Sequence, residues 1–121
     1  MKTVILVPNK NKDPDLSKTE KIRSFFYSKG YNVIIADNYK DEFGNYRYCA
    51  NISFAEYVVA IGGDGTFLQA VHDFSFIINV KFIGINLGTV GFLTTIEMET
   101  FKEQLDELLK KIAEEDKCPV E

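Results

Sequence analysis

One stretch of the sequence constrains the fold more than any other: an apolar run, a glycine-rich turn and an amphipathic run follow one another without a break. Tyr57–Ile61 is continuously apolar, Gly62–Gly65 reads Gly-Gly-Asp-Gly, and the amphipathic run continues to Phe74. A strand, a glycine turn and a helix in this order bring backbone N–H groups and a helix N-terminus to one point, which suits phosphate binding. The sequence therefore predicts an α/β domain with an anion-binding turn.

The rest of the chain continues this alternation of strand-like and helix-like segments. Short runs rich in Val, Ile and aromatic residues predict four strands: Thr3–Val7, Tyr31–Ala36, Tyr57–Ile61 and Lys81–Asn86. At least three of these runs are continuously apolar, as expected when helices cover both faces of a parallel sheet. Apolar residues at helical spacing predict helices within residues 17–30, 65–74 and 100–112. We expect a three-layer, Rossmann-like α/β fold with a mostly parallel, twisted sheet and flanking helices.

Polar residues predict where the helices begin and where the chain forms a long loop. Ser17-x-x-Glu20 and Thr100-x-x-Glu103 are typical of capping boxes, in which two side chains satisfy the first N–H groups of a helix. The apolar stripe of each helix is expected to pack in the core. Residues 38–51 are polar and contain several tyrosines, so they predict a surface loop with a short helical turn.

Size, charge and cysteine content limit the classes of function. With 121 residues, the chain fits one compact domain. A formal net charge of −4 argues against nucleic-acid or anionic-membrane partners, and no apolar run approaches the roughly 18 residues of a membrane-spanning helix. Cys49 and Cys118 predict free thiols in a reducing cytoplasm. His72 is the only histidine, so a metal site built from several histidines is excluded. We interpret His72 as an ordinary helix residue.

Asp64 is the unusual member of the first glycine turn. Gly62, Gly63 and Gly65 allow positive φ angles and close approach of the backbone to a ligand, because no Cβ intervenes. A carboxylate among phosphate-binding groups would repel its ligand, unless it accepts a proton from an attacking hydroxyl or acts through a metal ion. This combination favours phosphoryl transfer. The alternative interpretation is a tight turn in which Asp64 only caps the following helix.

A second glycine motif, Gly84–Thr94, reads Gly-Ile-Asn-Leu-Gly-Thr-Val-Gly-Phe-Leu-Thr. Gly88 and Gly91 allow close backbone approach, and Asn86 offers an amide that both donates and accepts hydrogen bonds. Phe92 is suited either to stack on a purine or to pack as a buried staple. Because both glycine motifs follow strands of one parallel sheet, we expect them at the same carboxyl-end edge, where α/β proteins bind ligands.

The two motifs together resemble those of a known family. Gly-Gly-Asp-Gly-Thr-Phe-Leu at 62–68, followed after one helix and one strand by the motif at 84–94, is similar to the N-terminal domain of the ATP-NAD kinases, also called inorganic polyphosphate/ATP-NAD kinases. Diacylglycerol and sphingosine kinases share the first motif, and 6-phosphofructokinase does so more distantly. Lipid kinases are expected to carry a segment ending near Gly-Asn-Asp at the second motif, and this chain does not. The resemblance extends from Met1 to about Ile112.

The resemblance implies an activity and a role for each motif residue. The family transfers the γ-phosphate of ATP, or a phosphate of polyphosphate, to the 2′-hydroxyl of the NAD adenosine ribose, which yields NADP and requires Mg²⁺ or another divalent metal. Asp64 corresponds to the catalytic base for that hydroxyl, and no side chain is assigned to the metal. The loop that faces the phosphates corresponds to Gly62, Gly63, Gly65 and Thr66. The adenine side of the NAD pocket corresponds to Leu68 and Phe92, and the second loop to Asn86, Gly88 and Gly91.

Family members continue into a second, β-rich domain, which holds both nucleotides and builds a homo-oligomer and has no counterpart in this sequence. We therefore expect residues 1–121 to be a single α/β domain, excised from a longer enzyme rather than a naturally short relative. Half a site cannot align two substrates, so the isolated chain should be inactive or nearly so. Two other interpretations stay open: a non-catalytic nucleotide-binding module, and a lipid or sugar kinase of the same superfamily.

Overall fold

The computed structural model describes residues 2–36, 54–88, 93–94 and 96–117, with side chains as far as Glu114. The predicted loop at 38–51, both cysteines, and Gly91 and Phe92 of the second motif lie outside these residues. The strands are β1 (Thr3–Pro8), β2 (Asn32–Ile35), β3 (Ala55–Gly62), β4 (Lys81–Asn86) and β5 (Ile96–Glu97). The helices are α1 (Ser17–Ser28), α3 (Asp64–Phe74), the 3₁₀ helix η2 (Met98–Thr100) and α4 (Phe101–Lys117). In the ranges described, none of the helices is both long and apolar enough to cross a membrane.

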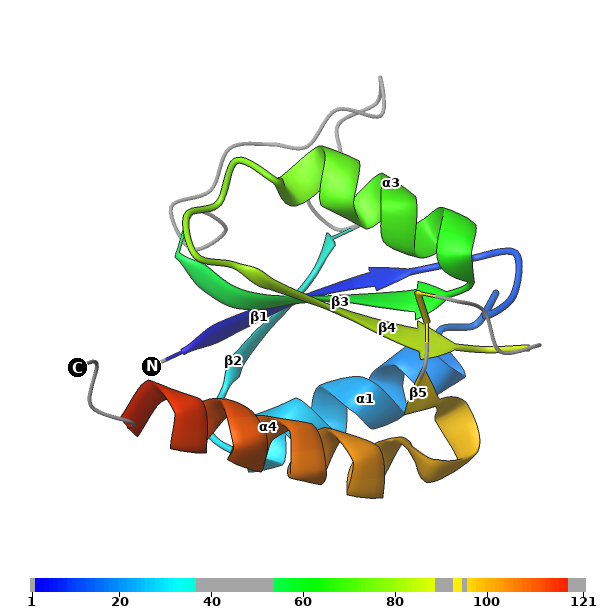
Figure 1. The fold of residues 1–121 in the computed structure, drawn as a ribbon. Helices are drawn as coiled ribbons and strands as arrows, with labels where there is room; N and C mark the ends of the chain where they lie inside the picture. The colour runs from blue at the N-terminus through cyan, green and yellow to red at the C-terminus, as the bar shows by residue number, and fades with distance from the viewer. Residues whose placement is uncertain (1, 37–53, 89–92, 95, 118–121) are drawn as a thin grey trace.

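The strands form one sheet with the order β2-β1-β3-β4-β5, and every pairing is parallel. The four predicted strands are confirmed, and β5 is an unpredicted strand of two residues that pairs with the end of β4. From β1 the chain moves to one side to form β2 and later to the other side to form β3 and β4 (Figure 1). Ligands of open α/β sheets bind at such a switch point, beyond the carboxyl ends of the strands. Here it lies between the ends of β1 and β3.

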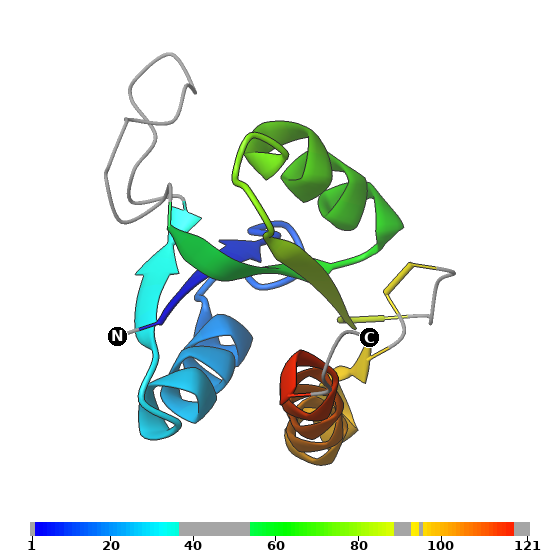
Figure 2. The ribbon, with the colours of Figure 1, turned by 60° about the vertical axis from the view of Figure 1, so that its left-hand side comes forward.

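Helices cover both faces of the sheet, which confirms the predicted three-layer α/β architecture. α1 and α4 lie side by side on one face, and α3 covers the other (Figures 1 and 2). Successive strand residues point to opposite faces, so Val4 and Leu6 of β1 pack with α1 and α4, while Ile5 and Val7 pack with α3. This burial on both faces explains why the strand runs show no polar alternation.

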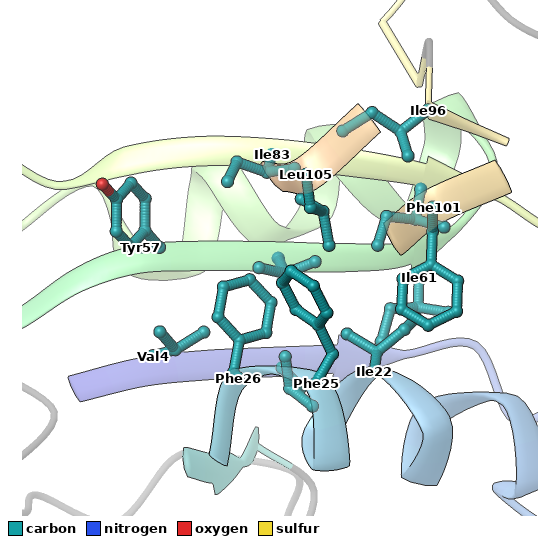
Figure 3. Close-up of a cluster of buried hydrophobic side chains, with 13 residues drawn as sticks. Val4, Ile22, Phe25, Phe26, Tyr57, Ile61, Ile83, Ile96, Phe101 and Leu105 are labelled. Atoms are coloured by element: carbon teal, nitrogen blue, oxygen red, sulfur yellow. The ribbon is translucent and has the colours of Figure 1, made fainter. Parts of the chain in front are cut away.

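The larger buried cluster lies between the sheet and the pair α1 and α4 (Figure 3). Phe25 and Phe26 of α1 meet edge to face with ring centroids 5.4 Å apart, and Phe25 meets Phe101 of α4 at 5.9 Å. Burying one such side chain contributes about 1.5–3 kcal/mol relative to leaving it exposed. The cluster therefore holds both helices firmly against the sheet, with side chains that the predicted stripes supply: Ile22, Phe25, Phe26, Phe101 and Leu105.

The capping box predicted for α1 is wrong, because two other carboxylates satisfy the first N–H groups of this helix. No side chain caps α1 from the residue that precedes it. The carboxylate of Asp13 accepts hydrogen bonds from the N–H groups of Lys18 at 3.2 Å and Thr19 at 2.9 Å. Asp15 accepts a hydrogen bond from the N–H of Ser17 at 3.1 Å. The start of α1 is thus occupied by the protein's own acidic side chains.

A different arrangement also replaces the box predicted for α4. Gln104, rather than Glu103, links the helix to the residues before it. Its Oε1 accepts hydrogen bonds from the Thr100 hydroxyl and from the N–H of Glu97, both at 2.9 Å. One amide side chain therefore joins the end of β5 to α4 across η2.

Candidate functional site

The candidate site lies at the edge where β1, β3 and β4 end. Gly62, the last residue of β3, is in register with Asn86, the last residue of β4. Beyond these ends, the N–H of Leu87 donates to the carbonyl oxygen of Gly62, and the N–H of Asn9 donates to that of Ile61, both at 2.9 Å. The turns that follow the three strands are thus tied together. The prediction that both glycine motifs lie at one edge of the sheet is confirmed.

Asp64 is the first residue of α3, and its side chain connects the two glycine motifs. Its Oδ1 accepts hydrogen bonds from the N–H of Leu93 at 3.2 Å, the N–H of Thr94 at 3.1 Å and the Thr94 hydroxyl at 3.0 Å. Hydrogen bonds to a carboxylate are stronger than those between neutral groups. Three of them on one oxygen hold the carboxylate in a fixed orientation at the start of the helix.

Thr94 is the residue through which the second motif holds Asp64. It is fully buried, and its hydroxyl accepts a hydrogen bond from Asn86 Nδ2 at 2.7 Å while donating to Asp64. The other end of the Asn86 amide accepts the N–H of Gly88 at 2.7 Å. A continuous chain of hydrogen bonds therefore runs from the second glycine loop to the carboxylate. The sequence analysis assigned no role to Thr94, although this residue is the last one of the second glycine motif.

The glycines of the first motif are used for their lack of a side chain and not for positive φ angles: Gly62 allows close packing, and Gly65 leaves space open. Gly63 has φ −133° and ψ −169°, and neither Gly62 nor Gly65 has a positive φ. The prediction that these glycines adopt positive φ angles is therefore wrong. A Cβ on Gly62 would lie 2.6 Å from Thr66 Oγ1 and 2.9 Å from Asn9 Cβ, which leaves no room for a side chain. A Cβ on Gly65 would have no atom within 4 Å. The first turn of α3 is therefore open to a ligand at Gly65.

Leu68 was expected both in the core and beside the adenine, and the first expectation is wrong. Leu68 is 58% exposed. It lies one turn after Asp64 on α3, and residues four apart share a face of a helix. The role of Leu68 beside the adenine stays a prediction. The same holds for Gly91 and Phe92, which lie outside the described residues.

The turn after β1 contributes two residues to which the sequence analysis assigned no role. Asn9 Nδ2 donates to the Thr66 hydroxyl at 3.1 Å, so this turn is fastened to α3. Lys12 Nζ lies 3.2 Å from the position that a Cβ on Gly63 would occupy. The available signal was that the turn directly follows a buried strand. Only the strand order, which places β1 beside β3, brings that turn to the glycine motif.

Two further carboxylates belong to this turn, and both bind the start of α1. Asp13 is 2% exposed and accepts the Thr19 hydroxyl at 2.8 Å in addition to two backbone N–H groups. Asp15 is exposed, and hydrogen bonds from the backbone N–H and then the side chain of Ser17 lower the pKa of its carboxyl below the ordinary 3.8. We assign both residues to the structure of the turn rather than to chemistry.

His72 was interpreted as an ordinary helix residue, and its surroundings agree with this. It lies in the last turn of α3 with its side chain 83% exposed. Its Nδ1 is 3.3 Å from Asp73 Oδ1, a solvent-exposed contact of the kind that contributes little to stability. No link from His72 to the glycine motifs is among the hydrogen bonds of the described residues.

Comparison with known proteins points to one family. Residues 4–113 match the family model described as the ATP-NAD kinase N-terminal domain. A NAD kinase of Lachnospira eligens is 38% identical over 116 residues, which cover 91% of this chain and 39% of the relative. A NAD kinase of Lachnoclostridium phytofermentans is 35% identical over 89% of this chain and 38% of the relative. One of Protochlamydia amoebophila is 30% identical over 88% and 38%. The chain thus spans about two fifths of the length of these curated relatives.

Proposed function

The chain belongs to the ATP-NAD kinase family, and we propose that it forms the part of a NAD kinase at which the 2′-hydroxyl of the NAD adenosine ribose is phosphorylated by ATP. The position of Asp64 carries this proposal. Its carboxylate lies in the first turn of α3, beside the switch point of the sheet, and is bonded to the end of the second glycine motif. A fixed carboxylate among N–H donors suits proton transfer from a hydroxyl that attacks a phosphate.

The proposed reaction gives the residues of the site separate tasks. Asp64 accepts the proton of the ribose 2′-hydroxyl, or aligns that hydroxyl, while the hydroxyl oxygen forms a bond to the γ-phosphorus of ATP. The bond from that phosphorus to the bridging oxygen breaks, and ADP leaves. N–H groups of the Gly62–Thr66 turn face the charge on the transferred group. Thr94 and Asn86 keep Asp64 in position, and a misplacement of about 1 Å in such a site can cost on the order of 100-fold in rate.

Recognition of the NAD adenine falls to Leu68 and Phe92 in this proposal. Leu68 is exposed one helical turn after Asp64, so an adenine packed on Leu68 would bring its ribose toward the carboxylate. Phe92 would complete the adenine side. The second loop would border the nucleotide with Asn86, Gly88 and Gly91.

The divalent metal that the resemblance implies is a separate part of the proposal. The described residues contain no group of three His, Cys, Asp or Glu side chains that could hold a metal ion. These residues therefore do not fit a metal site built by the protein alone, and we derive no step through the ion. We propose that Mg²⁺ enters bound to the phosphates of ATP, whose charge it would offset.

We further propose that these residues work as one part of a larger cytoplasmic enzyme that forms a homo-oligomer. The matched segment covers only 39% and 38% of two curated relatives. Holding two substrates in line is worth roughly 7–11 kcal/mol of the barrier. The isolated chain is therefore expected to bind nucleotides and to turn them over slowly or not at all.

A chimeric enzyme tests the proposed function. Residues 4–113 of this chain would replace the matching segment of the Lachnospira eligens NAD kinase, and NADP formed from NAD and Mg-ATP would be measured with an NADP-specific dehydrogenase. We expect the chimera to form NADP. Asp64→Asn should lower kcat by about 100-fold or more, because the amide keeps the shape but cannot accept the proton. Binding of NAD, measured by calorimetry, should change by less than about threefold.

Two results would count against the proposal. A folded chimera that binds NAD and ATP but releases no NADP would contradict the assigned activity. Near-normal kcat in Asp64→Asn would remove the proton-accepting role of Asp64 and leave only alignment. The unmodified relative, assayed in parallel, provides the reference rate.

A further inference from the structure

The turn after β1 places an ammonium group between the two glycine motifs. Lys12 Nζ lies 3.2 Å from the position of a Cβ on Gly63 and 4.0 Å from that of a Cβ on Gly88. Gly63 follows β3, and Gly88 follows β4. Among the residues that the structure describes, Lys12 forms no ion pair. A single cation therefore borders both loops without a carboxylate partner in the described part of the chain.

The backbone that carries Lys12 is fixed on both sides. The N–H of Lys12 donates to the carbonyl oxygen of Asn9 at 3.1 Å and to its side-chain oxygen at 3.3 Å. Asn9 is in turn bonded to Thr66 of α3. On the other side, the buried carboxylate of Asp13 is bonded to Thr19 of α1. Because the turn is anchored to two helices, mainly the side chain of Lys12 must be ordered when an anion binds.

The start of α3, beside Lys12, is open where the start of α1 is closed. Gly63 is the N-cap residue of α3, and no side-chain cap hydrogen bond is formed there. The positive end of the helix dipole and its first N–H groups favour a negative charge at this point. The negative charge of Asp64 in the same turn is bound to Leu93 and Thr94. Gly65 leaves the approach unobstructed.

We propose that Lys12 binds the phosphoanhydride chain of a nucleotide substrate, together with the N–H groups at the start of α3. The proposal rests on the kinase function argued above. An ammonium group is a compact charge that binds phosphate oxygens at about 2.7–2.9 Å. Gly63 and Gly88 have no side chains, so a phosphate bound to Lys12 can also reach the backbone of both loops. The triphosphate of ATP and the diphosphate of NAD share this chemistry, and the site lies where the transferred group must pass.

Calorimetry on the 121-residue chain tests the proposal without requiring turnover. Inorganic tripolyphosphate would be titrated at low ionic strength into the wild type, Lys12→Ala, Lys12→Arg and the control Lys21→Ala, which removes an exposed lysine from α1. We expect Lys12→Ala to weaken binding about tenfold or more, as for loss of one charge-assisted hydrogen bond. Lys12→Arg should retain binding within about threefold and Lys21→Ala within about twofold, because each keeps a cation at the site.

Titrations with ATP and with NAD identify the source of the phosphate. Lys12 dependence for ATP alone assigns the site to the phosphate donor, and dependence for NAD alone assigns it to the acceptor. Equal affinity of wild type and Lys12→Ala for tripolyphosphate, or no binding by the wild type at millimolar ligand, would overturn the proposal. The chimera reports separately on the kinase function. Lys12-dependent binding beside an inactive chimera would reject only the activity, and the reverse pair of results would reject only the role of Lys12.

Discussion

Replacing Thr94 by valine would remove one hydroxyl from the middle of the hydrogen-bond chain that ends on Asp64. Valine has nearly the same shape as threonine, so the change tests the hydroxyl rather than the packing. Thr94 is fully buried, and its hydroxyl both donates to Asp64 and accepts from Asn86. Two hydrogen bonds would be lost together, of which the one to Asn86 is buried and the one to Asp64 is part-buried.

The two losses differ in size because their partners differ. Asn86 is 4% exposed and would keep a buried N–H without this partner, which costs about 1–3 kcal/mol. Among the described residues, three donors bond to Asp64 Oδ1, of which it would lose one and keep two N–H groups, a loss of about 1 kcal/mol. The free energy of unfolding should therefore fall by about 2–4 kcal/mol. At about 4 °C per kcal/mol for a chain of this size, Tm should fall by roughly 8–16 °C.

Urea unfolding followed by circular dichroism measures this effect. Thr94→Val should lower the midpoint with an unchanged slope, because the same surface is exposed on unfolding. Thr94→Ser keeps the hydroxyl and should recover most of the stability. Thr100→Val is the matched control, since it removes an exposed hydroxyl bonded to Gln104, and it should cost less than about 1 kcal/mol. If Thr94→Val were no more destabilising than Thr100→Val, the hydrogen-bond chain would not hold the site together.

Two further predictions concern the glycine motif and the turn before α1. Gly62→Ala should destabilise the chain by about 1–3 kcal/mol in urea unfolding, because its Cβ would meet Thr66 Oγ1 at 2.6 Å. Gly65→Ala has free space and should stabilise the chain by up to about 1 kcal/mol. A change in the free energy of unfolding of the same sign for both variants would contradict the packing described. The N–H of Ser17 is the main cause of the lowered pKa of Asp15, so the ionised carboxylate stabilises the fold above pH 3.8, and this contribution is lost as the pH falls through the lowered pKa. The stability of Asp15→Asn should therefore depend less on pH in that range, as measured by acid unfolding. An acid-unfolding profile identical to that of the wild type would argue against this contribution of Asp15.

The fold could be predicted well where one segment determines its own structure. The strand runs lack polar alternation because both faces are buried, and this made a parallel α/β sheet recognisable from composition along the chain. β5 was missed because two residues carry no periodic signal, and its pairing with Ile85 depends on the end of β4. The capping box of α1 failed because Asp13 and Asp15, which precede the helix, accept its first N–H groups. The box of α4 failed because Gln104 accepts the hydrogen bonds from Thr100 and Glu97 instead.

The candidate site was predictable only along the two motifs themselves. Parallel strands end at the same edge, and this was enough to bring Gly62 and Asn86 together. Asn9 and Lys12 were missed because the sequence does not state that β1 lies beside β3. Thr94 was missed because its role depends on a contact with Asp64, thirty positions earlier.

The bond between Asp64 and Thr94 has a consequence for how relatives are interpreted. This aspartate helps to hold Leu93 and Thr94 in place before β5, so folding alone gives a reason to keep it. A homologue without kinase activity would still be selected to keep this aspartate, because its loss would destabilise the fold. The presence of the aspartate in a sequence is therefore weak evidence for catalysis, and an inactive paralogue could carry the complete Gly-Gly-Asp-Gly motif.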